Sequence, residues 1–189
     1  FMAMLDVNPV MIYNGQELGE KGMDNEGFSG VDGRTSIFDY WSMQSIRAWA
    51  NNGLFDGGQL NDEQRAFRES YKKILNLVNN EKALALGHFY GLAYCNRHNP
   101  YFPAEQMMAY LRKYENELIL VLINFDNKEY NFRIHLPQNA FDVLNIPDNT
   151  VSTVKELISG EETLCSLTYT CPYQDSISAY STKVLKFNY

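Results

Sequence analysis

The spacing of apolar residues changes about halfway along the chain. In the first half, apolar side chains recur three or four positions apart, which predicts an amphipathic helix of about five turns. The residues of this stripe are Phe67, Tyr71, Ile74, Leu75 and Val78. Asn61 or Asp62 supplies the N-cap, with Gln64 or Arg65 three positions further on, and Asn79-Asn80 ends the helix.

Beyond residue 103 the apolar pattern favours strands joined by turns. Every second residue is apolar in 130–136, the period of a strand with one buried face. The segments predicted as strands are 107–114, 118–125, 130–136, 143–146, 163–170 and 177–187. Several short strands separated by turns are typical of an antiparallel β-sandwich.

The beginning of the chain has the order helix, break, strand. Phe1 to Leu5 form an apolar helical run without a cap, so we expect the chain to start inside a helix of a longer protein. Pro9 ends this helix. The apolar run Val10 to Tyr13 is typical of a strand buried on both faces, as in a parallel sheet. An acidic loop with many glycines follows over 15–36, and a short helix is expected over 45–51.

Composition and charge exclude several classes of protein. Of the 189 residues, 45% are hydrophobic and 21% charged, which excludes a disordered or low-complexity scaffold. The net charge of -7 makes nucleic acids and anionic membranes unlikely partners. Cys95, Cys165 and Cys171 are too few for a disulfide framework. A bridge between the last two and free thiols both remain open.

Candidate chemistry is sparse. The chain has no dinucleotide fingerprint, phosphate-binding loop, CxxC pair or GxSxG elbow. His88, His98 and His135 stand far apart, without partners at metal-ligand spacing. The carboxylates of 15–36 could provide a pair for glycoside hydrolysis or ligands for calcium, although their spacing matches no calcium loop. A solvated acidic loop is the simpler interpretation.

Several segments, read in order, resemble the α-amylase family of glycoside hydrolases. Pro9 to Gly19, with the pattern Tyr-x-Gly-x-Glu-x-Gly, resembles the eighth strand of the catalytic barrel and its exit. Arg34 to Trp41 resembles the stretch that follows, and 63–91 the last barrel helix. The segments that resemble the β-sandwich called domain C are 118–125, 155–161 and 183–185.

The resemblance implies an α+β fragment in two parts. Residues 1–103 would be the remnant of a (β/α)8 barrel, its last strand and helix, and 104–189 an antiparallel β-sandwich that supports the barrel. The family's aspartate nucleophile, glutamate acid/base and second aspartate would lie upstream of Phe1. We therefore expect no catalytic residue here and no hydrolysis by this chain alone. The full-length protein would be a retaining α-glycosidase acting on α-glucans or maltooligosaccharides.

The same resemblance suggests which residues would contact sugar. Gln16, Glu17, Asp32 and Arg34 would line outer subsites, because the chemistry of such barrels lies at the C-terminal ends of the strands. Alternatively, Arg34 pairs with Asp32 or Asp39 and only fixes the loop. We expect no metal ligand and no cofactor in this chain, while a calcium ion stays open for the full-length protein. Related enzymes are often secreted or periplasmic, but the sequence does not define the compartment.

Two other functions fit the same residues. In a carbohydrate-binding module, surface aromatics would stack on sugars in an exposed row on one face of the sandwich. The candidates for such a row are Tyr101, Phe102, Tyr169, Tyr173 and Tyr180. A purely structural sandwich would have no such row.

Outside a complete barrel, its last strand and helix would leave apolar side chains without partners. The side chains concerned are Val10, Met11, Ile12, Phe67, Tyr71 and Leu75. We therefore expect self-association, a swapped dimer or a displaced N-terminal segment.

Overall fold

The computed structural model describes residues 2–20 and 43–189 and divides the chain into two units. Unit 1 comprises Phe1–Asn8 and Leu77–Tyr189, and unit 2 comprises Pro9–Asn76. The helices within the described ranges all lack the length or the apolar composition that crossing a bilayer requires. The loop predicted over 15–36 lies mostly outside the described residues.

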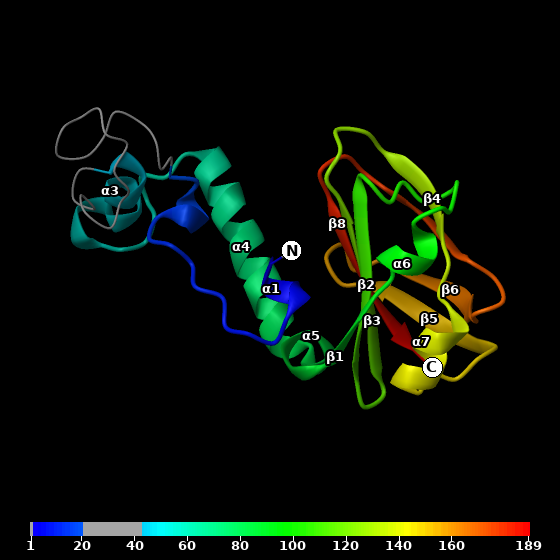
Figure 1. Ribbon diagram of the computed structural model, residues 1–189. Helices are drawn as coiled ribbons and strands as arrows, with labels where there is room; N and C mark the ends of the chain where they lie inside the picture. Colours follow the sequence, from blue (N-terminus) through cyan, green and yellow to red (C-terminus); the bar gives the residue numbers. More distant parts are fainter. Residues whose placement is uncertain (1, 21–42) are drawn as a thin grey trace. The chain divides into compact units, whose positions relative to one another are not determined.

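Unit 1 is built on two antiparallel sheets (Figure 1). The larger sheet has the order β1-β2-β3-β8-β5-β6, and the smaller one pairs β4 with β7. The strands are β1 (His88–Gly91), β2 (Met107–Tyr114), β3 (Glu117–Asn124), β4 (Tyr130–Ile134), β5 (Thr150–Glu156), β6 (Glu162–Leu167), β7 (Tyr173–Ile177) and β8 (Thr182–Asn188). This confirms the predicted antiparallel sandwich.

The larger sheet is covered on both faces. Leu120 of β3 belongs to the core that also contains residues of β4, β7 and helix α7 (Gln138–Leu144). Its neighbour Val121 points the other way, into a second core with Met4 of α1 (Met2–Leu5) and Leu84 of α5 (Lys82–Leu86). Because both faces are buried, β3 is apolar without alternation.

A buried arginine joins the short helices to this sheet. Arg112 of β2 is 1% exposed. Its Nε donates to the carbonyl of Ala83 at 3.1 Å, Nη2 to that of Leu84 at 3.0 Å, and Nη1 to that of Leu5 at 3.1 Å. Burial lowers the pKa of the guanidinium. The cation lies where α1 and α5 present carbonyl oxygens, the end of a helix that attracts positive charge.

Helices dominate the described part of unit 2. They are η1 (Gln16–Leu18), α3 (Gln44–Ala50), η2 (Asn51–Gly53) and α4 (Asp62–Asn80), the last of which continues into unit 1. The predicted capping box is confirmed, because the backbone N–H of Gln64 donates to Asn61 Oδ1 at 2.8 Å and that of Asn61 to Gln64 Oε1 at 3.1 Å. The amphipathic helix runs from Asp62 to Asn80, as expected.

The strand predicted at Val10 to Tyr13 is absent, which corrects the expectation of a barrel strand in this chain. The segment has no regular secondary structure, and Met11 is 90% exposed. A parallel strand exists only when neighbours satisfy its backbone and cover both faces. The described residues offer this segment no neighbouring strand, so its apolar pattern alone does not make it one.

In unit 1, two further strand predictions were wrong and one strand was not predicted. Residues 143–146 form no strand: Val143 and Leu144 end helix α7, in which Phe141 and Leu144 face the core, and Asn145 closes the last turn with φ 51°. Strand β5 was missed, and 177–187 divides into β7 and β8 around a turn at Tyr180, whose φ is 48°. These segments take their form from the sheet on which they pack.

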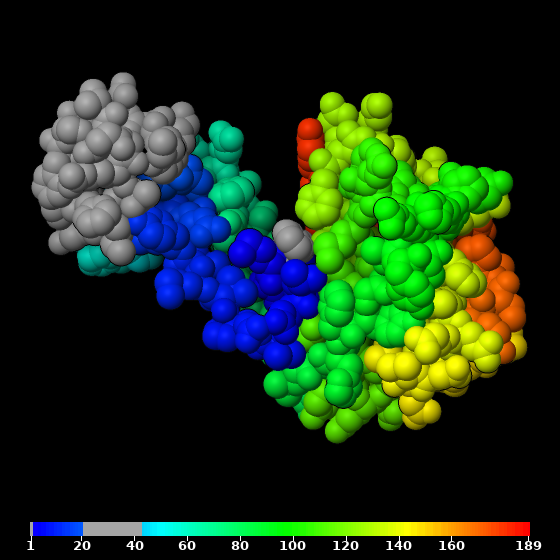
Figure 2. Space-filling model, in the orientation of Figure 1, coloured from blue at the N-terminus to red at the C-terminus, as the bar shows by residue number. Residues whose placement is uncertain are grey.

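The sandwich also begins earlier than residue 104. Strand β1 pairs with β2, with His88 opposite Lys113 and Gly91 opposite Tyr110. The short helix α6 (Ala93–Asn96) follows it. In Figure 2 the green to yellow segments, which carry β1 to β4, α6 and α7, form one continuous surface of unit 1. The boundary expected between 103 and 104 therefore falls inside this unit.

Candidate functional site

The segment that resembles a barrel strand exit forms a tight turn in unit 2. Gly15 and Gly19 flank η1 with φ angles of 88° and 72°. A side chain at either position would be strained in this left-handed conformation. The pattern Gly-x-x-x-Gly thus brings Gln16 and Glu17 together on one short helical turn.

Gln16 joins this turn to helix α4. Its Nε2 donates to Tyr71 Oη at 2.9 Å, and its Oε1 accepts from the backbone N–H of Tyr13 at 3.2 Å. Gln16 therefore links the backbone of Tyr13 to the hydroxyl of Tyr71, two residues that line the same cavity as Glu17.

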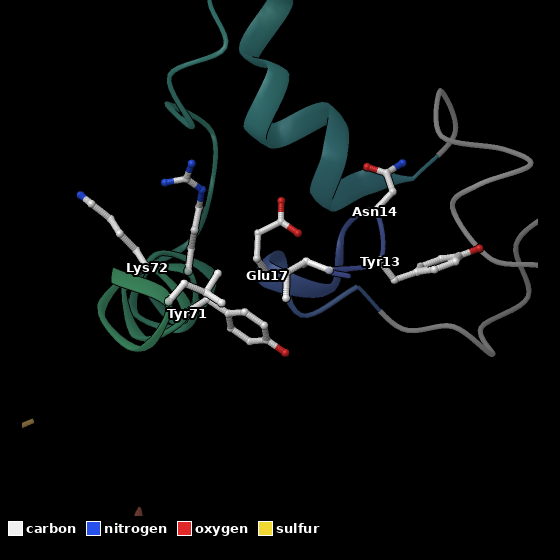
Figure 3. A pocket seen from close by; sticks show the side chains of 8 residues that line it. Tyr13, Asn14, Glu17, Tyr71 and Lys72 are labelled. Carbon is white, nitrogen blue, oxygen red and sulfur yellow. The ribbon is translucent and has the colours of Figure 1, made fainter. Parts of the chain in front are cut away.

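Glu17 contributes to an open cavity of about 530 Å³. The lining consists of Ile12, Tyr13, Asn14, Glu17, Arg68, Tyr71, Lys72 and Leu75. Figure 3 shows Glu17 between Asn14 on one side and Tyr71 and Lys72 of α4 on the other. Two cations, one carboxylate and two tyrosines therefore face the same cavity.

These side chains are suited to binding a hydroxyl-rich ligand. Tyrosine rings, a carboxylate and cationic donors together recognise hydroxyl-rich ligands by stacking and hydrogen bonds. Glycoside hydrolysis needs two carboxyl groups about 5–9.5 Å apart, and Glu17 is the single carboxylate in the described lining. Asp32 and Arg34, expected to share this site, lie outside the described residues.

No metal site emerges from the part of the chain that the structure describes. Within 2–20 and 43–189, His, Cys, Asp and Glu side chains form no group of three or more that could hold an ion. Cys95, Cys165 and Cys171 are free thiols, so the bridge between Cys165 and Cys171 does not form.

The five aromatics proposed as an exposed row do not form one. Tyr101 and Tyr180 are 59% and 73% exposed, whereas Phe102 is 4% exposed. Tyr169 and Tyr173 are half-buried and pack against the core. The feature expected of a carbohydrate-binding module with a flat aromatic face is thus missing, although Tyr101 stands out as a single exposed ring.

Comparison with solved structures identifies the fold of this chain. The chain has the fold of a part of α-amylase-family glycoside hydrolases. It spans well under two thirds of the length of the proteins it resembles. Protein-family models and curated proteins, compared by sequence, gave no match.

Three of the similar structures define the extent of the likeness. AmyP in complex with maltose aligns with 98% of this chain at TM-score 0.64 and 15% identity, over 32% of its own length. A variant of AmyP in complex with maltotriose aligns with 72% of this chain at TM-score 0.51 and 15% identity, over 23% of its length. The maltogenic α-amylase AmyB from Thermotoga neapolitana aligns with 69% of this chain at TM-score 0.50 and 13% identity, over 27% of its own length.

Proposed function

We propose that this chain is the C-terminal part of an α-amylase-type glycosidase that cleaves α-glucans with retention of configuration. The observation that carries the proposal is the alignment of 98% of the chain with about a third of AmyP, a protein solved with maltose. The order of the two units agrees with it, since a helical unit that resembles the end of a barrel precedes an antiparallel sandwich.

In this proposal the chain binds sugar and supports the barrel, while the catalytic carboxylates come from the polypeptide before it. Glu17 would accept hydrogen bonds from sugar hydroxyls, and Tyr13, which is 39% exposed, would offer a ring for stacking. Gln16 would act through Tyr13 and Tyr71 by holding both. Asp32 and Arg34 would complete the subsite.

The sandwich would stabilise the barrel by packing. Its larger sheet already uses its second face to hold α5 and the end of α4, because Leu77 and Val78 pack against the core that contains Leu84 and Val121. The last helix of the proposed barrel is thereby anchored at its C-terminal end.

The experiment compares two polypeptides, the 189-residue chain and the longer natural polypeptide that carries it. Each is incubated with maltoheptaose, and proton NMR follows the anomer released first. We expect the longer polypeptide to release the α-anomer and the 189-residue chain to release nothing. Cleavage by the 189-residue chain, or a longer polypeptide without action on α-glucans, would overturn the proposal.

The binding residues are tested in the longer polypeptide. Glu17→Gln removes the charge and keeps the shape, and we expect it to raise KM about tenfold with kcat little changed, the signature of lost binding in ground and transition states alike. Lys73→Gln on α4, outside the cavity lining, serves as the matched control. A lowered kcat with KM unchanged would show that Glu17 acts in the chemical step instead.

A further inference from the structure

A second surface with chemistry of its own lies on the outer face of the small sheet. Tyr101, Asn131, Arg133 and Gln174 line an open cavity of about 420 Å³, together with Phe132 and Asp175. All of these residues belong to unit 1 and are distant in sequence from the Glu17 cavity.

The sheet register aligns three of these side chains in a row. Arg133 of β4 lies opposite Gln174 of β7. On its other side, the backbone N–H of Arg133 donates to the carbonyl of Tyr101 at 2.9 Å, so the Tyr101 segment lies alongside β4. Strand alternation turns Phe132 into the core, where it meets the ring of Phe102, and leaves Arg133 outside. The ring of Tyr101, the guanidinium of Arg133 and the amide of Gln174 therefore lie in a row across the face.

A network of asparagines holds this row in place. Asn96, which is fully buried, accepts from the backbone N–H of His135 at 2.8 Å and donates to its carbonyl at 2.9 Å. Asn99 donates to the carbonyl of Arg133 at 2.8 Å and accepts from the backbone N–H of Tyr101 at 3.0 Å. Because Asn99 binds β4 and Asn96 binds His135 just beyond its end, the loop carrying Tyr101 is ordered before any ligand arrives, which reduces the entropic cost of binding.

The exposed groups on this face are available to a ligand. The Arg133 guanidinium carbon lies 4.9 Å from the centre of the Tyr101 ring, yet Tyr101 remains 59% exposed. Within the described residues no carboxylate forms an ion pair with Arg133. Asp175, which also lines the cavity, is paired with Lys183 at 2.9 Å. The face thus offers one ring, one fork of N–H donors and two side-chain amides.

We propose that this face, the Tyr101–Arg133 platform, is a second saccharide-binding site, separate from the Glu17 cavity. A ring flanked by forked donors and amides complements the apolar face and the hydroxyl edge of a pyranose. Arg133 is the one cation in the described lining of the cavity, and on a chain of net charge -7 it does not attract an anionic polymer. The ligand class is therefore a neutral oligosaccharide, and the choice of an α-glucan within that class rests on the function proposed above.

The test uses the full 189-residue chain and needs no catalysis. Maltotetraose is titrated into the labelled protein by NMR, and migration through native gels with and without soluble starch gives a second measure. We expect Tyr101→Ala and Arg133→Ala each to weaken binding about tenfold, equivalent to about 1.4 kcal/mol. Tyr101→Phe keeps the ring and should retain binding. Tyr180→Ala, an exposed tyrosine outside the cavity lining, is the matched control.

The outcomes separate this inference from the function proposed above. Binding that is lost in Tyr101→Ala and kept in Tyr101→Phe and Glu17→Gln supports the platform. The same pattern with cellotetraose preferred over maltotetraose supports the platform and refutes the α-glucan as its ligand. Wild-type binding by both alanine variants, or no binding of either sugar at millimolar concentration, overturns the platform, whether or not the longer polypeptide cleaves α-glucans.

Discussion

Replacing Arg112 tests the account of how the short helices are held on the sandwich. Arg112→Met keeps the length and apolar stem of the side chain and removes the three hydrogen bonds to α1 and α5. The carbonyl of Ala83 keeps the backbone N–H of Gly87 at 3.1 Å as a partner. The buried carbonyl of Leu84 and the half-buried one of Leu5 each lose the guanidinium N–H that binds them.

The expected loss follows from these contacts. A buried acceptor left without a partner costs about 1–3 kcal/mol, and a hydrogen bond from a charged donor contributes about 1.5–3 kcal/mol. Burying a cation without a carboxylate has a cost of its own, which the variant no longer carries. We therefore expect Arg112→Met to lower the free energy of unfolding of unit 1 by about 3 kcal/mol.

Urea unfolding followed by far-ultraviolet circular dichroism measures this change. Arg97→Met, at an exposed arginine of the same unit, is the control and should stay within about 0.5 kcal/mol of the wild type. Hydrogen exchange of peptides from α5 should rise in the Arg112 variant. A loss below about 1 kcal/mol would refute the idea that the guanidinium holds the two helices.

Three other changes probe unit 1 and the exposed start of unit 2. The hydroxyl of Tyr110 is buried without a hydrogen-bond partner among the described residues. Tyr110→Phe should therefore leave the free energy of unfolding unchanged or raise it by up to about 1 kcal/mol, which thermal melts would show as an equal or higher melting temperature. A clear fall in the melting temperature would reveal a partner. Burial raises the pKa of the Glu117 carboxyl above its ordinary value of 4.5, so its contribution to stability is present below the unfolded-state pKa and is lost as pH rises through the folded-state pKa. Glu117→Gln should therefore stabilise more at pH 7 than at pH 4 in thermal melts, and an equal effect at both would contradict this. Met11 is 90% exposed, so we expect the chain to self-associate as its concentration rises, measured by sedimentation velocity. Met11→Ser should weaken this association. A wild-type chain that stays monomeric at all concentrations would exclude the association.

Local signals in the sequence were sufficient for several elements. The reciprocal hydrogen bonds of Asn61 and Gln64 and the spacing from Phe67 to Val78 predicted α4 because both depend only on residues close in sequence. Strand β2 was predicted with its bounds, Met107 to Tyr114. For the candidate site, the glycines around η1 and the residues Gln16 and Glu17 came from the motif alone.

The rest of the candidate site required contacts between distant residues. Arg68, Tyr71 and Lys72 enter the Glu17 cavity from α4, and the bond from Gln16 to Tyr71 shows which face of that helix meets η1. In the sequence, the stripe that contains Tyr71 predicts apolar packing. No spacing rule in the sequence marks a residue fifty positions away as part of a site.

By itself the sequence determined what short-range physics controls: an amphipathic helix with its cap, strands that alternate or stay apolar, and turns at glycine and asparagine. The tertiary structure decided whether those preferences were realised. Val10 to Tyr13 remained without a strand because no neighbour pairs with it, whereas 143–146 became the end of a helix because Phe141 and Leu144 fill the core. Likewise, Tyr101 and Arg133 became neighbours through the backbone hydrogen bond between them and through Asn99, which ties the Tyr101 loop to β4. Backbone pairing and burial are supplied by residues far away in the chain, and a local pattern cannot contain them.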